Sequence, residues 1–142
     1  MISIFAFLVI LVFAWIIYRN IFIADYSVDK LIRVIDGDTF ELFSNDTIIR
    51  LLCVNTPEED EEGYEEAKTF LEDLLYSNVF HMEYSNYGNY TDAYGRLLMW
   101  VYIEDESGEQ ILINKLIIEE GYGELMIIPP ETCKEITEII AN

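Results

Sequence analysis

The sequence predicts an α+β domain, a small β-barrel with helices packed on it, which follows an apolar N-terminal segment. Three observations predict this fold class. Short β-rich runs alternate with turn residues, and other segments place apolar residues every three or four positions, as one face of a helix does. The chain has 142 residues, and the roughly 118 that follow the apolar segment are enough for one modest core.

The β-rich runs supply the predicted strands. The first two flank Asp36-Gly37-Asp38, a sequence typical of a hairpin turn. We predict strands at residues 30–35, 39–43, 47–54, 79–84 and 96–103. We predict an acidic turn at residues 104–109, which contains Gly108.

The helical periodicity predicts three helices. Within residues 62–76 the apolar side chains recur at spacings of three and four, namely Ala67, Phe70, Leu71, Leu74 and Leu75. Residues 112–120 fit a second helix, which Gly121 ends. A short last helix is expected at 131–141, after Pro129-Pro130.

The N-terminal segment predicts a membrane anchor. Residues 2–18 carry no charge, and residues 2–23 are long enough to span a bilayer if Arg19 reaches the interface. A cleavable signal peptide is the alternative, but no basic residue precedes the apolar run and no small-residue cleavage motif follows it. We therefore predict an uncleaved transmembrane helix at 1–24 and one domain at 25–142.

The charge balance is strongly acidic. The chain has 27 Asp and Glu residues against 8 Lys and Arg, and all the acids lie at Asp25 or later. Since Arg19 is the one basic residue before that point, the domain carries seven bases and 27 acids, a charge of −20. Taken alone, this argues against nucleic acid as a partner, because proteins usually bind polyphosphates with a basic surface. A high-salt environment would screen this repulsion.

The two cysteines and the single histidine exclude a convincing zinc site. Cys53 lies in the apolar run 51–54, so we expect a buried free thiol. A disulfide with Cys133 is the alternative outside the cytoplasm. His81 is expected to be an ordinary strand or surface residue.

Four stretches contain the residues best suited to chemistry. They are Val34-Ile35-Asp36-Gly37-Asp38-Thr39, Arg50-Leu51-Leu52-Cys53-Val54-Asn55-Thr56-Pro57-Glu58, Asp92-Ala93-Tyr94-Gly95-Arg96, and Leu112-Ile113-Asn114-Lys115-Leu116 running to Glu120-Gly121. Each has an ordinary alternative when taken singly: the first as a simple hairpin turn, Arg50 and Arg96 as surface ion pairs. In this order, however, the stretches resemble the staphylococcal nuclease family over residues 30–128.

The resemblance implies a five-stranded OB-type barrel with three helices. It also implies an endonuclease of the thermonuclease type, which hydrolyses phosphodiester bonds in DNA and RNA with calcium as cofactor. One calcium ion per domain is expected, with other divalent cations as the alternative. Single-stranded DNA or RNA is the expected substrate, and no protein partner is identifiable from the sequence.

Three residues would hold the metal ion by this resemblance. Asp38 stands at the position of a metal carboxylate, Asn55 at that of the second side-chain ligand, and Thr56 at that of a backbone carbonyl ligand. A hard cation bound by oxygen ligands lowers the pKa of bound water and screens the charge of the phosphate. The best-known member has aspartate at position 55, so asparagine here removes a negative charge and should weaken metal binding.

Three further residues occupy the catalytic positions. Arg50 and Arg96 stand where the family has its two phosphate-binding arginines, whose planar guanidinium groups match phosphate oxygens and stabilise charge in the transition state. Glu58 stands where a carboxylate orients the attacking water or takes its proton. Tyr94 is expected to bind substrate by lying beside the nucleotide.

Two segments depart from the family. The family loop after the position of Glu58 is longer and carries lysines, whereas residues 59–62 here are all acidic. They fit an acidic helix start or, alternatively, a rim that collects cations. Ile127 and Pro129 stand where nucleotide-stacking aromatic residues are expected, so base preference is not transferred.

Two other functions stay open from the sequence. A catalytically inactive, nuclease-like binding module tethered to the membrane would fit Asn55 and the charge of −20. A membrane-tethered module that binds a basic protein would fit the same acidity. We expect a single-pass membrane protein. Members of the family are commonly secreted, which favours an extracytoplasmic catalytic domain, while Arg19 and Lys30 favour the opposite orientation.

Overall fold

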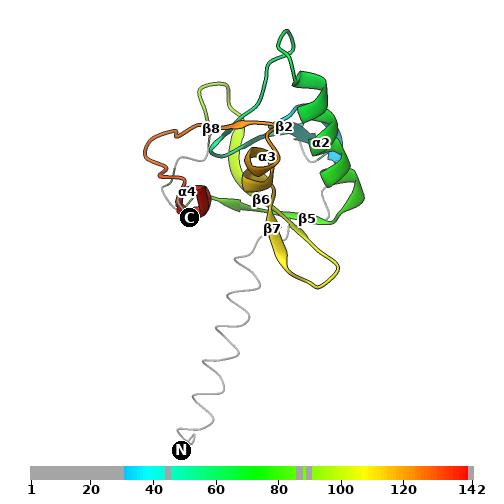
Figure 1. Cartoon of the computed structure of the whole chain (residues 1–142). Coiled ribbons are helices and arrows are strands. Elements are labelled where there is room, and N and C mark those ends of the chain that lie inside the picture. The colour runs from blue at the N-terminus through cyan, green and yellow to red at the C-terminus, as the bar shows by residue number, and fades with distance from the viewer. Residues whose placement is uncertain (1–30, 44–45, 86–87, 89–90, 141–142) are drawn as a thin grey trace, which may run out of the picture.

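The computed structural model describes residues 31–43, 46–85, 88 and 91–140, and its central feature is a mixed β-sheet (Figure 1). In hydrogen-bonded order the sheet consists of β1 (Leu31–Asp36), β2 (Thr39–Leu42), β3 (Thr47–Leu51), β6 (Leu97–Glu104) and β5 (Phe80–Tyr84). Neighbours are antiparallel except for β3 and β6, which are parallel. A sixth strand, β7 (Gln110–Leu112), pairs with β6 across the acidic turn.

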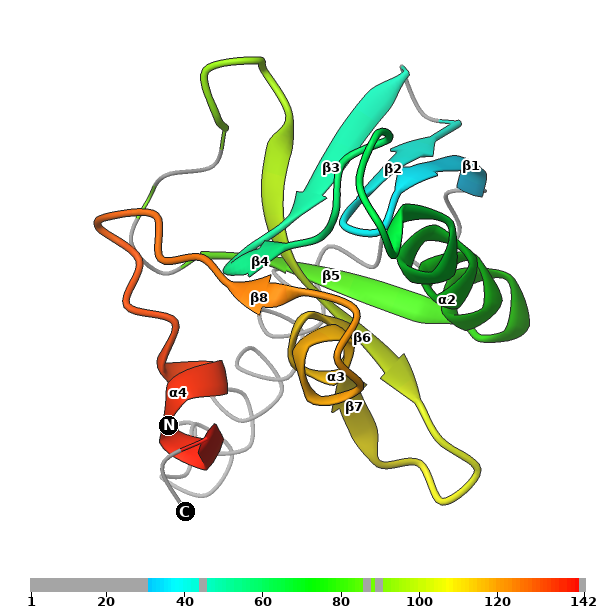
Figure 2. The ribbon, with the colours of Figure 1, turned by 45° about the horizontal axis from the view of Figure 1, so that its top comes forward.

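The described residues also contain three helices: α2 (Tyr64–Ser77), α3 (Ile113–Glu119) and α4 (Lys134–Ile140). Helix α2 packs along β1, and α3 lies against β6 and the small sheet formed by β4 (Val54–Asn55) and β8 (Glu124–Leu125) (Figure 2). The predicted α+β class with three helices is confirmed. The five predicted strands correspond to the main path of the sheet, to which β7 and the β4–β8 pair are added.

Apolar side chains of the sheet and of α2 form the main core. Helix α2 buries Ala67, Leu71 and Leu75, three of the five residues whose spacing predicts the helix. Leu71 and Leu75 belong to one cluster with Phe40 and Phe80, whose rings meet edge to face with centroids 5.8 Å apart. Because a fully buried Leu or Phe contributes about 1.5–3 kcal/mol, this apolar face is sufficient to hold α2 on the sheet.

The predicted strand at 47–54 is in fact two strands. Strand β3 ends at Leu51, and β4 begins at Val54. Between them Cys53 has a φ of 63°, a left-handed conformation that a continuous strand excludes. The β-rich composition of this run predicts one extended strand and not the turn that divides it.

The two cysteines form a disulfide, so the prediction of a free thiol at Cys53 is wrong and the alternative holds. Their Cα atoms lie 5.9 Å apart although they are 80 residues apart in the sequence. The prediction of burial is right, since neither residue is exposed. The bond lies in a second apolar cluster, which brings the turn after β3 against the start of α4; the cluster also contains Leu52, Leu98, Trp100 and Ile136.

The predicted membrane anchor at 1–24 lies outside the described residues. Within the part that the structure describes, none of the helices has the length and apolar character needed to cross a membrane. The division into an anchor and a domain at 25–142 therefore stays a prediction from the sequence.

Candidate active site

The hairpin turn between β1 and β2 buries one of its two aspartates. Asp36 ends β1, and its Oδ1 accepts a hydrogen bond of 3.0 Å from the backbone N–H of Asp38. Asp38 itself is only 4% exposed. Aspartates in ordinary turns stay in water, and fully buried ones are normally paired. The burial of Asp38 therefore indicates a role beyond forming the turn.

Gly37 is needed between the two aspartates because other segments approach it closely. A Cβ atom at this position would lie 2.6 Å from the Cβ of Ala67 on α2 and 2.9 Å from the Cβ of Thr56. The glycine thus lets α2 and the segment after β4 pack directly against the turn. As a result Thr56 lies beside Asp38, and its backbone N–H donates to Oδ2 of Asp38 at 3.0 Å.

Asp38 forms a buried ion pair with Arg50 of β3. Thr39 and Arg50 face each other in the β2–β3 register, and Nη1 of Arg50 lies 2.8 Å from Oδ2 of Asp38. Each of the two side chains is 6% exposed, and Thr39 Oγ1 donates to Oδ1 of Asp38 at 2.9 Å. The alternative of a surface ion pair is therefore wrong for Arg50.

Burial opposes both charges of this pair. It raises the pKa of Asp38 to about 6, while Arg50 opposes the rise and Asp36 adds to it. Burial also lowers the pKa of Arg50, while Asp38 opposes the decrease and the positive charge of Arg96 adds to it. A further cation near Asp38 would stabilise its ionised form, which is the form that a metal ligand needs.

The turn after β3 fixes the guanidinium group of Arg50. Its Nη1 donates to the carbonyl of Val54 at 2.7 Å and to that of Leu51 at 3.3 Å. Its Nη2 lies 3.5 Å from the side-chain oxygen of Asn55. The Nη2 side of the guanidinium is therefore the side that faces Asn55, which is exposed.

A tight turn before β6 presents Arg96 and Tyr94. Oδ1 of Asp92 accepts hydrogen bonds from the N–H groups of Tyr94 and Arg96, at 2.9 and 3.0 Å, and Oδ2 pairs with Nε of Arg96 at 2.6 Å. Although partial burial opposes the change, hydrogen bonds from Arg96 lower the pKa of Asp92. Arg96 does form the ion pair of the simple alternative, through Nε, and its side chain is 28% exposed.

Tyr94 lies at the edge of the site. Its ring is 85% exposed, and the guanidinium carbon of Arg96 lies 5.4 Å from the ring centroid. Both residues, together with Thr47 and Ile48 at the start of β3, line a shallow cavity of 340 Å³. An exposed aromatic ring beside a cation suits the face of a nucleobase.

Arg50 lies at the centre of the charged group. Its pKa responds to the charges of Asp38, Arg96 and Glu58, which come from three other parts of the chain. The parallel pairing of β3 with β6 brings the segment of Arg96 alongside that of Arg50. The structure thus places Arg50 in contact with Asp38, and the charges of Arg96 and Glu58 lie near enough to affect its pKa.

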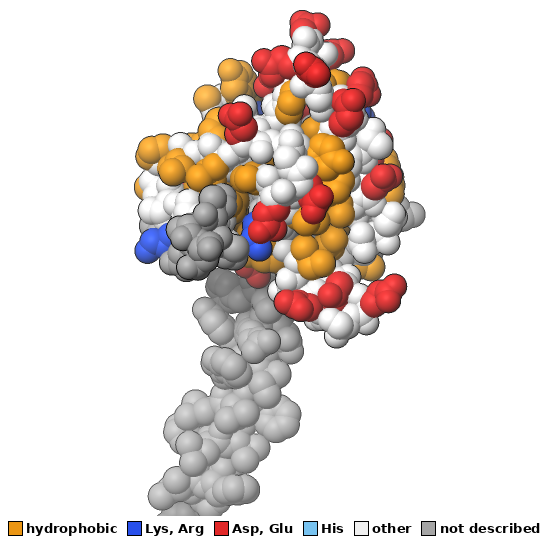
Figure 3. All heavy atoms as spheres, viewed as in Figure 1, with side chains coloured by type: hydrophobic (Ala, Val, Ile, Leu, Met, Phe, Trp, Pro, Cys, Tyr) orange, Lys and Arg blue, Asp and Glu red, His pale blue; other side chains and the backbone are white. Residues whose placement is uncertain are grey.

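Glu58 begins the acidic segment that joins β4 to α2. Its N–H donates to Oε2 of Glu61 at 2.9 Å, and the N–H of Glu61 donates to the carbonyl of Glu58 at 2.8 Å. Helix α2 begins only at Tyr64, after Gly63 with a φ of 94°, so the predicted helix start at residue 62 is early. The segment projects at the top of Figures 1 and 3, where acidic side chains gather.

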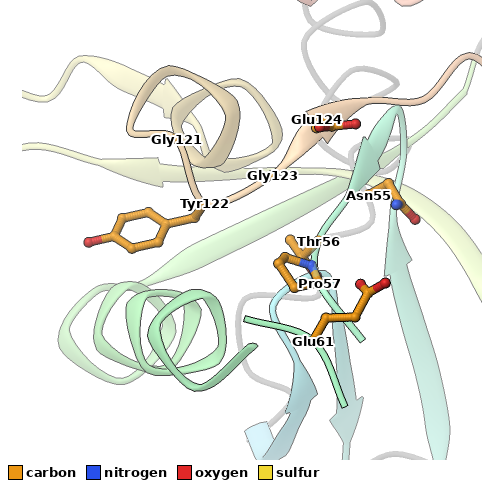
Figure 4. Close-up of a pocket in the computed structure, with 8 residues that line it drawn as sticks. All are labelled: Asn55, Thr56, Pro57, Glu61, Gly121, Tyr122, Gly123 and Glu124. Carbon is orange, nitrogen blue, oxygen red and sulfur yellow. The ribbon is translucent and has the colours of Figure 1, made fainter. Parts of the chain in front are cut away.

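A polar cavity of 360 Å³ lies beside Asn55 (Figure 4). It is lined by Asn55, Thr56, Pro57, Glu61, Gly121, Tyr122, Gly123 and Glu124. Pairing of β4 with β8 brings Glu124 opposite Asn55, so the wall at 121–124 comes from a strand pair that the sequence does not predict. Tyr122 turns away from the cavity toward α2, where its ring stacks on Phe70 with centroids 4.3 Å apart.

The predicted metal ligands supply oxygen donors alone. They are the carboxylate of Asp38, the amide oxygen of Asn55 and the backbone carbonyl of Thr56, donors of the kind that calcium prefers. Among the described residues, no three His, Cys, Asp or Glu side chains form a cluster able to hold a metal ion. The donor chemistry and the buried carboxylate of Asp38 fit a divalent cation, although Asn55 leaves this ligand set with a single negative charge.

Known proteins resemble this chain over most of the described domain. A model of the family described as "Staphylococcal nuclease homologue" matches residues 48–141, a range that includes Arg50, Glu58 and Arg96 and begins after Asp38. The chain is 33% identical over 99 residues to "Endonuclease YncB" of Bacillus subtilis (strain 168), covering 63% of this chain and 46% of that protein. It is 29% identical over 98 residues to "SPbeta prophage-derived endonuclease YokF" of the same organism, covering 63% of this chain and 33% of that protein. The chain thus spans less than half the length of these two relatives. Because the family model covers well over half of its residues, the chain belongs to the family of staphylococcal nuclease homologues.

Proposed function

We propose that the domain is a metal-dependent endonuclease of the thermonuclease type, which hydrolyses phosphodiester bonds in single-stranded DNA or RNA with calcium as its ion. The observation that carries the proposal is the buried ion pair of Arg50 with Asp38, beside which the pairing of β3 with β6 places the segment that begins at Arg96. Both relatives have "endonuclease" in their names, which supports the class of reaction.

The two arginines bind the phosphate that is attacked. Arg50 contributes from the base of the site through its Nη2 side, and Arg96 contributes its Nη atoms from the rim. Each guanidinium group donates hydrogen bonds to phosphate oxygens, whose negative charge grows as water attacks. Their existing partners, Asp38 and Asp92, hold both guanidinium groups in place before substrate binds. The two groups therefore lose little conformational freedom when substrate binds.

Glu58 acts on the attacking water. The oxygen of this water forms the new bond to phosphorus, and its proton passes to Glu58 or, if Glu58 only orients the water, to solvent. One P–O ester bond breaks, and the leaving oxygen takes up a proton from solvent and departs as a hydroxyl group. The exposure of Glu58 leaves room for the water beside it. Calcium held by Asp38, Asn55 and the Thr56 carbonyl would supply a lowered pKa for bound water and screening of the phosphate charge.

A single strand suits the surface around the site better than a duplex does. Acidic side chains outnumber basic ones on the face in Figure 3, so the long-range field repels every phosphate that is not held by an arginine. A flexible single strand can bring one phosphate to the arginines and stack a base on Tyr94, a contact worth about 1–3 kcal/mol. A rigid duplex would bring a second row of phosphates against the acidic surface.

The first test is cleavage with and without metal. The purified chain should cut a labelled single-stranded oligonucleotide internally when calcium is present, and excess chelator should stop the reaction. Asp38→Asn should lower the activity at limiting calcium, because it removes the one carboxylate of the predicted ligand set. Binding of the oligonucleotide with no cleavage under any divalent cation would instead support the inactive binding module.

Asn55→Asp should tighten calcium binding. The change adds a second anionic ligand, and calcium affinity rises with ligand charge, here by about tenfold. Isothermal titration calorimetry measures the Kd directly. Gln110→Glu is the matched control, because it adds the same charge at an exposed residue of β7 and should leave the Kd unchanged. Equal calcium affinity in Asn55→Asp and the parent chain would place Asn55 outside the coordination sphere.

A further inference from the structure

The disulfide joins the turn that carries site residues to the C-terminal segment. Cys53 lies three residues after Arg50 and two before Asn55. Val54 lies between Cys53 and Asn55, and its carbonyl accepts the 2.7 Å hydrogen bond from Nη1 of Arg50. A shift of this turn therefore moves an acceptor of Arg50 and a predicted metal ligand at the same time.

The turn adopts a conformation that its surroundings must hold. Cys53 has a φ of 63°, and residues other than glycine in this region cost about 1–3 kcal/mol of strain. The N–H of Leu52 donates a hydrogen bond to the carbonyl of Met99, and the N–H of Met126 donates one to the carbonyl of Cys53, both at 3.0 Å. The side chain of Asn114 donates to the Leu52 carbonyl at 2.9 Å. The disulfide adds a covalent link at the residue that is strained.

At its other end the disulfide holds the segment that leads into the short helix α4. Cys133 immediately precedes the seven-residue helix α4 and also has a positive φ, 53°. Besides the disulfide, the buried carboxylate of Glu131 fixes this segment, since it accepts hydrogen bonds from Ser85 Oγ at 2.5 Å and from the N–H of Thr132 at 2.8 Å. Among the side chains of α4 that the structure describes, Ile136 belongs to the second apolar cluster.

We propose that the Cys53–Cys133 disulfide is a positioning element of the site, and that its reduction converts the domain to a form with weaker calcium binding and slower turnover. The activity part of this inference rests on the proposed function. Opening the bond frees Cys53 to leave its strained conformation, and Val54 and Asn55 move with it. The site then no longer presents Arg50 and Asn55 in one fixed arrangement.

The reductant is a dithiol. One of its thiolates attacks a disulfide sulfur and forms a mixed disulfide, and its second thiol then displaces the protein sulfur. In the net reaction the two protein sulfurs gain two electrons and two protons, and the dithiol becomes a disulfide. Both cysteines are fully buried, so the attack requires α4 to move away first. Such a bond forms in an oxidising compartment, which agrees with an extracytoplasmic domain.

The test compares the full chain with Cys133→Ser and with a control that is destabilised elsewhere. Leu75→Ala is that control, because Leu75 is buried near the C-terminal end of α2 and its truncation costs about 2–5 kcal/mol. Three quantities are measured under conditions where circular dichroism shows each protein folded: the calcium Kd, the kcat/KM on a single-stranded oligonucleotide, and amide hydrogen exchange at residues 52–55.

Cys133→Ser should bind calcium about tenfold more weakly, as for loss of a residue that orients a metal ligand. Its kcat/KM should fall by about tenfold or more, because small misplacements of catalytic groups are costly, and residues 52–55 should lose exchange protection. Leu75→Ala should match the parent in all three. Parent-like values in folded Cys133→Ser would overturn the proposal.

Two further outcomes are also decisive. If the parent chain does not cleave nucleic acid at all, the proposed function fails, while calcium affinity and hydrogen exchange still test the positioning. If Cys133→Ser does not fold, the parent chain is measured before reduction by dithiothreitol, after it, and after reoxidation. Reversible loss of calcium affinity in a folded reduced chain supports the proposal, and unfolding on reduction overturns it in favour of a purely structural bond.

Discussion

Replacing Arg96 by alanine is expected to lower the kcat for oligonucleotide cleavage by about 10²–10³-fold, or roughly 2.7–4 kcal/mol in the barrier, as for loss of one preorganised donor to the transition state. The fold should tolerate this change, because the Arg96 side chain is 28% exposed and its partner Asp92 lies at the same turn. Steady-state kinetics with saturating calcium measures the effect.

Arg50→Ala is expected to reduce kcat by a similar factor and also to destabilise the fold. Arg50 is buried against Asp38, and breaking a buried pair by removing one partner costs about 3–5 kcal/mol. Arg50→Lys separates the two effects, since it keeps a cation beside Asp38 but loses the planar pair of donors. It should therefore retain more stability than Arg50→Ala and still lose turnover.

Arg33→Ala is the matched control for both arginines. Arg33 pairs with Glu41 at 2.7 Å, but its side chain is 66% exposed, and surface pairs of this kind contribute about 0–1 kcal/mol. Its removal changes the net charge by the same amount as removal of a site arginine. Full activity in Arg96→Ala or in folded Arg50→Lys would remove that residue from the proposed mechanism.

Loss of the disulfide is expected to lower the free energy of unfolding by as much as Arg50→Ala does. Crosslinking residues that are 80 positions apart removes chain entropy from the unfolded state worth about 4.5 kcal/mol. Small domains have a free energy of unfolding of about 5–15 kcal/mol, so Cys133→Ala should lose a large share of its stability while it stays folded without denaturant.

Urea denaturation followed by circular dichroism measures this effect as a shift of the midpoint. The reduced parent chain should show nearly the same shift as Cys133→Ala, because both lack the crosslink. If the reduced parent chain and Cys133→Ala both have the urea midpoint of the oxidised parent chain, the disulfide does not constrain the unfolded chain as expected.

Much of the fold follows from local sequence patterns, whereas the residues of the charged site are predicted through the resemblance to the staphylococcal nuclease family. The spacing of Ala67, Leu71 and Leu75 predicts α2 because one periodic apolar face is enough to fix a helix on a sheet. The turn at 36–38 is predicted because its residue types are those of a hairpin. The pattern does not predict that Asp38 is buried, because its burial depends on the close approach of α2 to Gly37.

The remaining features depend on contacts between distant segments. The turn at Cys53 interrupts a run with strong β propensity because Asn114 and the disulfide hold it there, and neither is near in sequence. Strand β8 is only two residues long and exists through its pairing with β4, so no local periodicity marks it. The cavity wall beside Asn55 is missed for the same reason.

The assignment of Glu58 as the carboxylate that acts on the attacking water is central to the proposal that this site performs chemistry and does not only bind. Glu58→Gln tests it most directly, because the substitution keeps size and hydrogen bonding but removes the base. We expect kcat to fall by about 10²–10⁴-fold, the usual contribution of a general acid or base. The Kd for a single-stranded oligonucleotide, measured in parallel with calcium present, should stay within about twofold, because the arginines supply phosphate binding. Parent-like turnover in Glu58→Gln, or an equal loss of binding and turnover, would contradict the assignment of Glu58 and with it the proposed catalytic site.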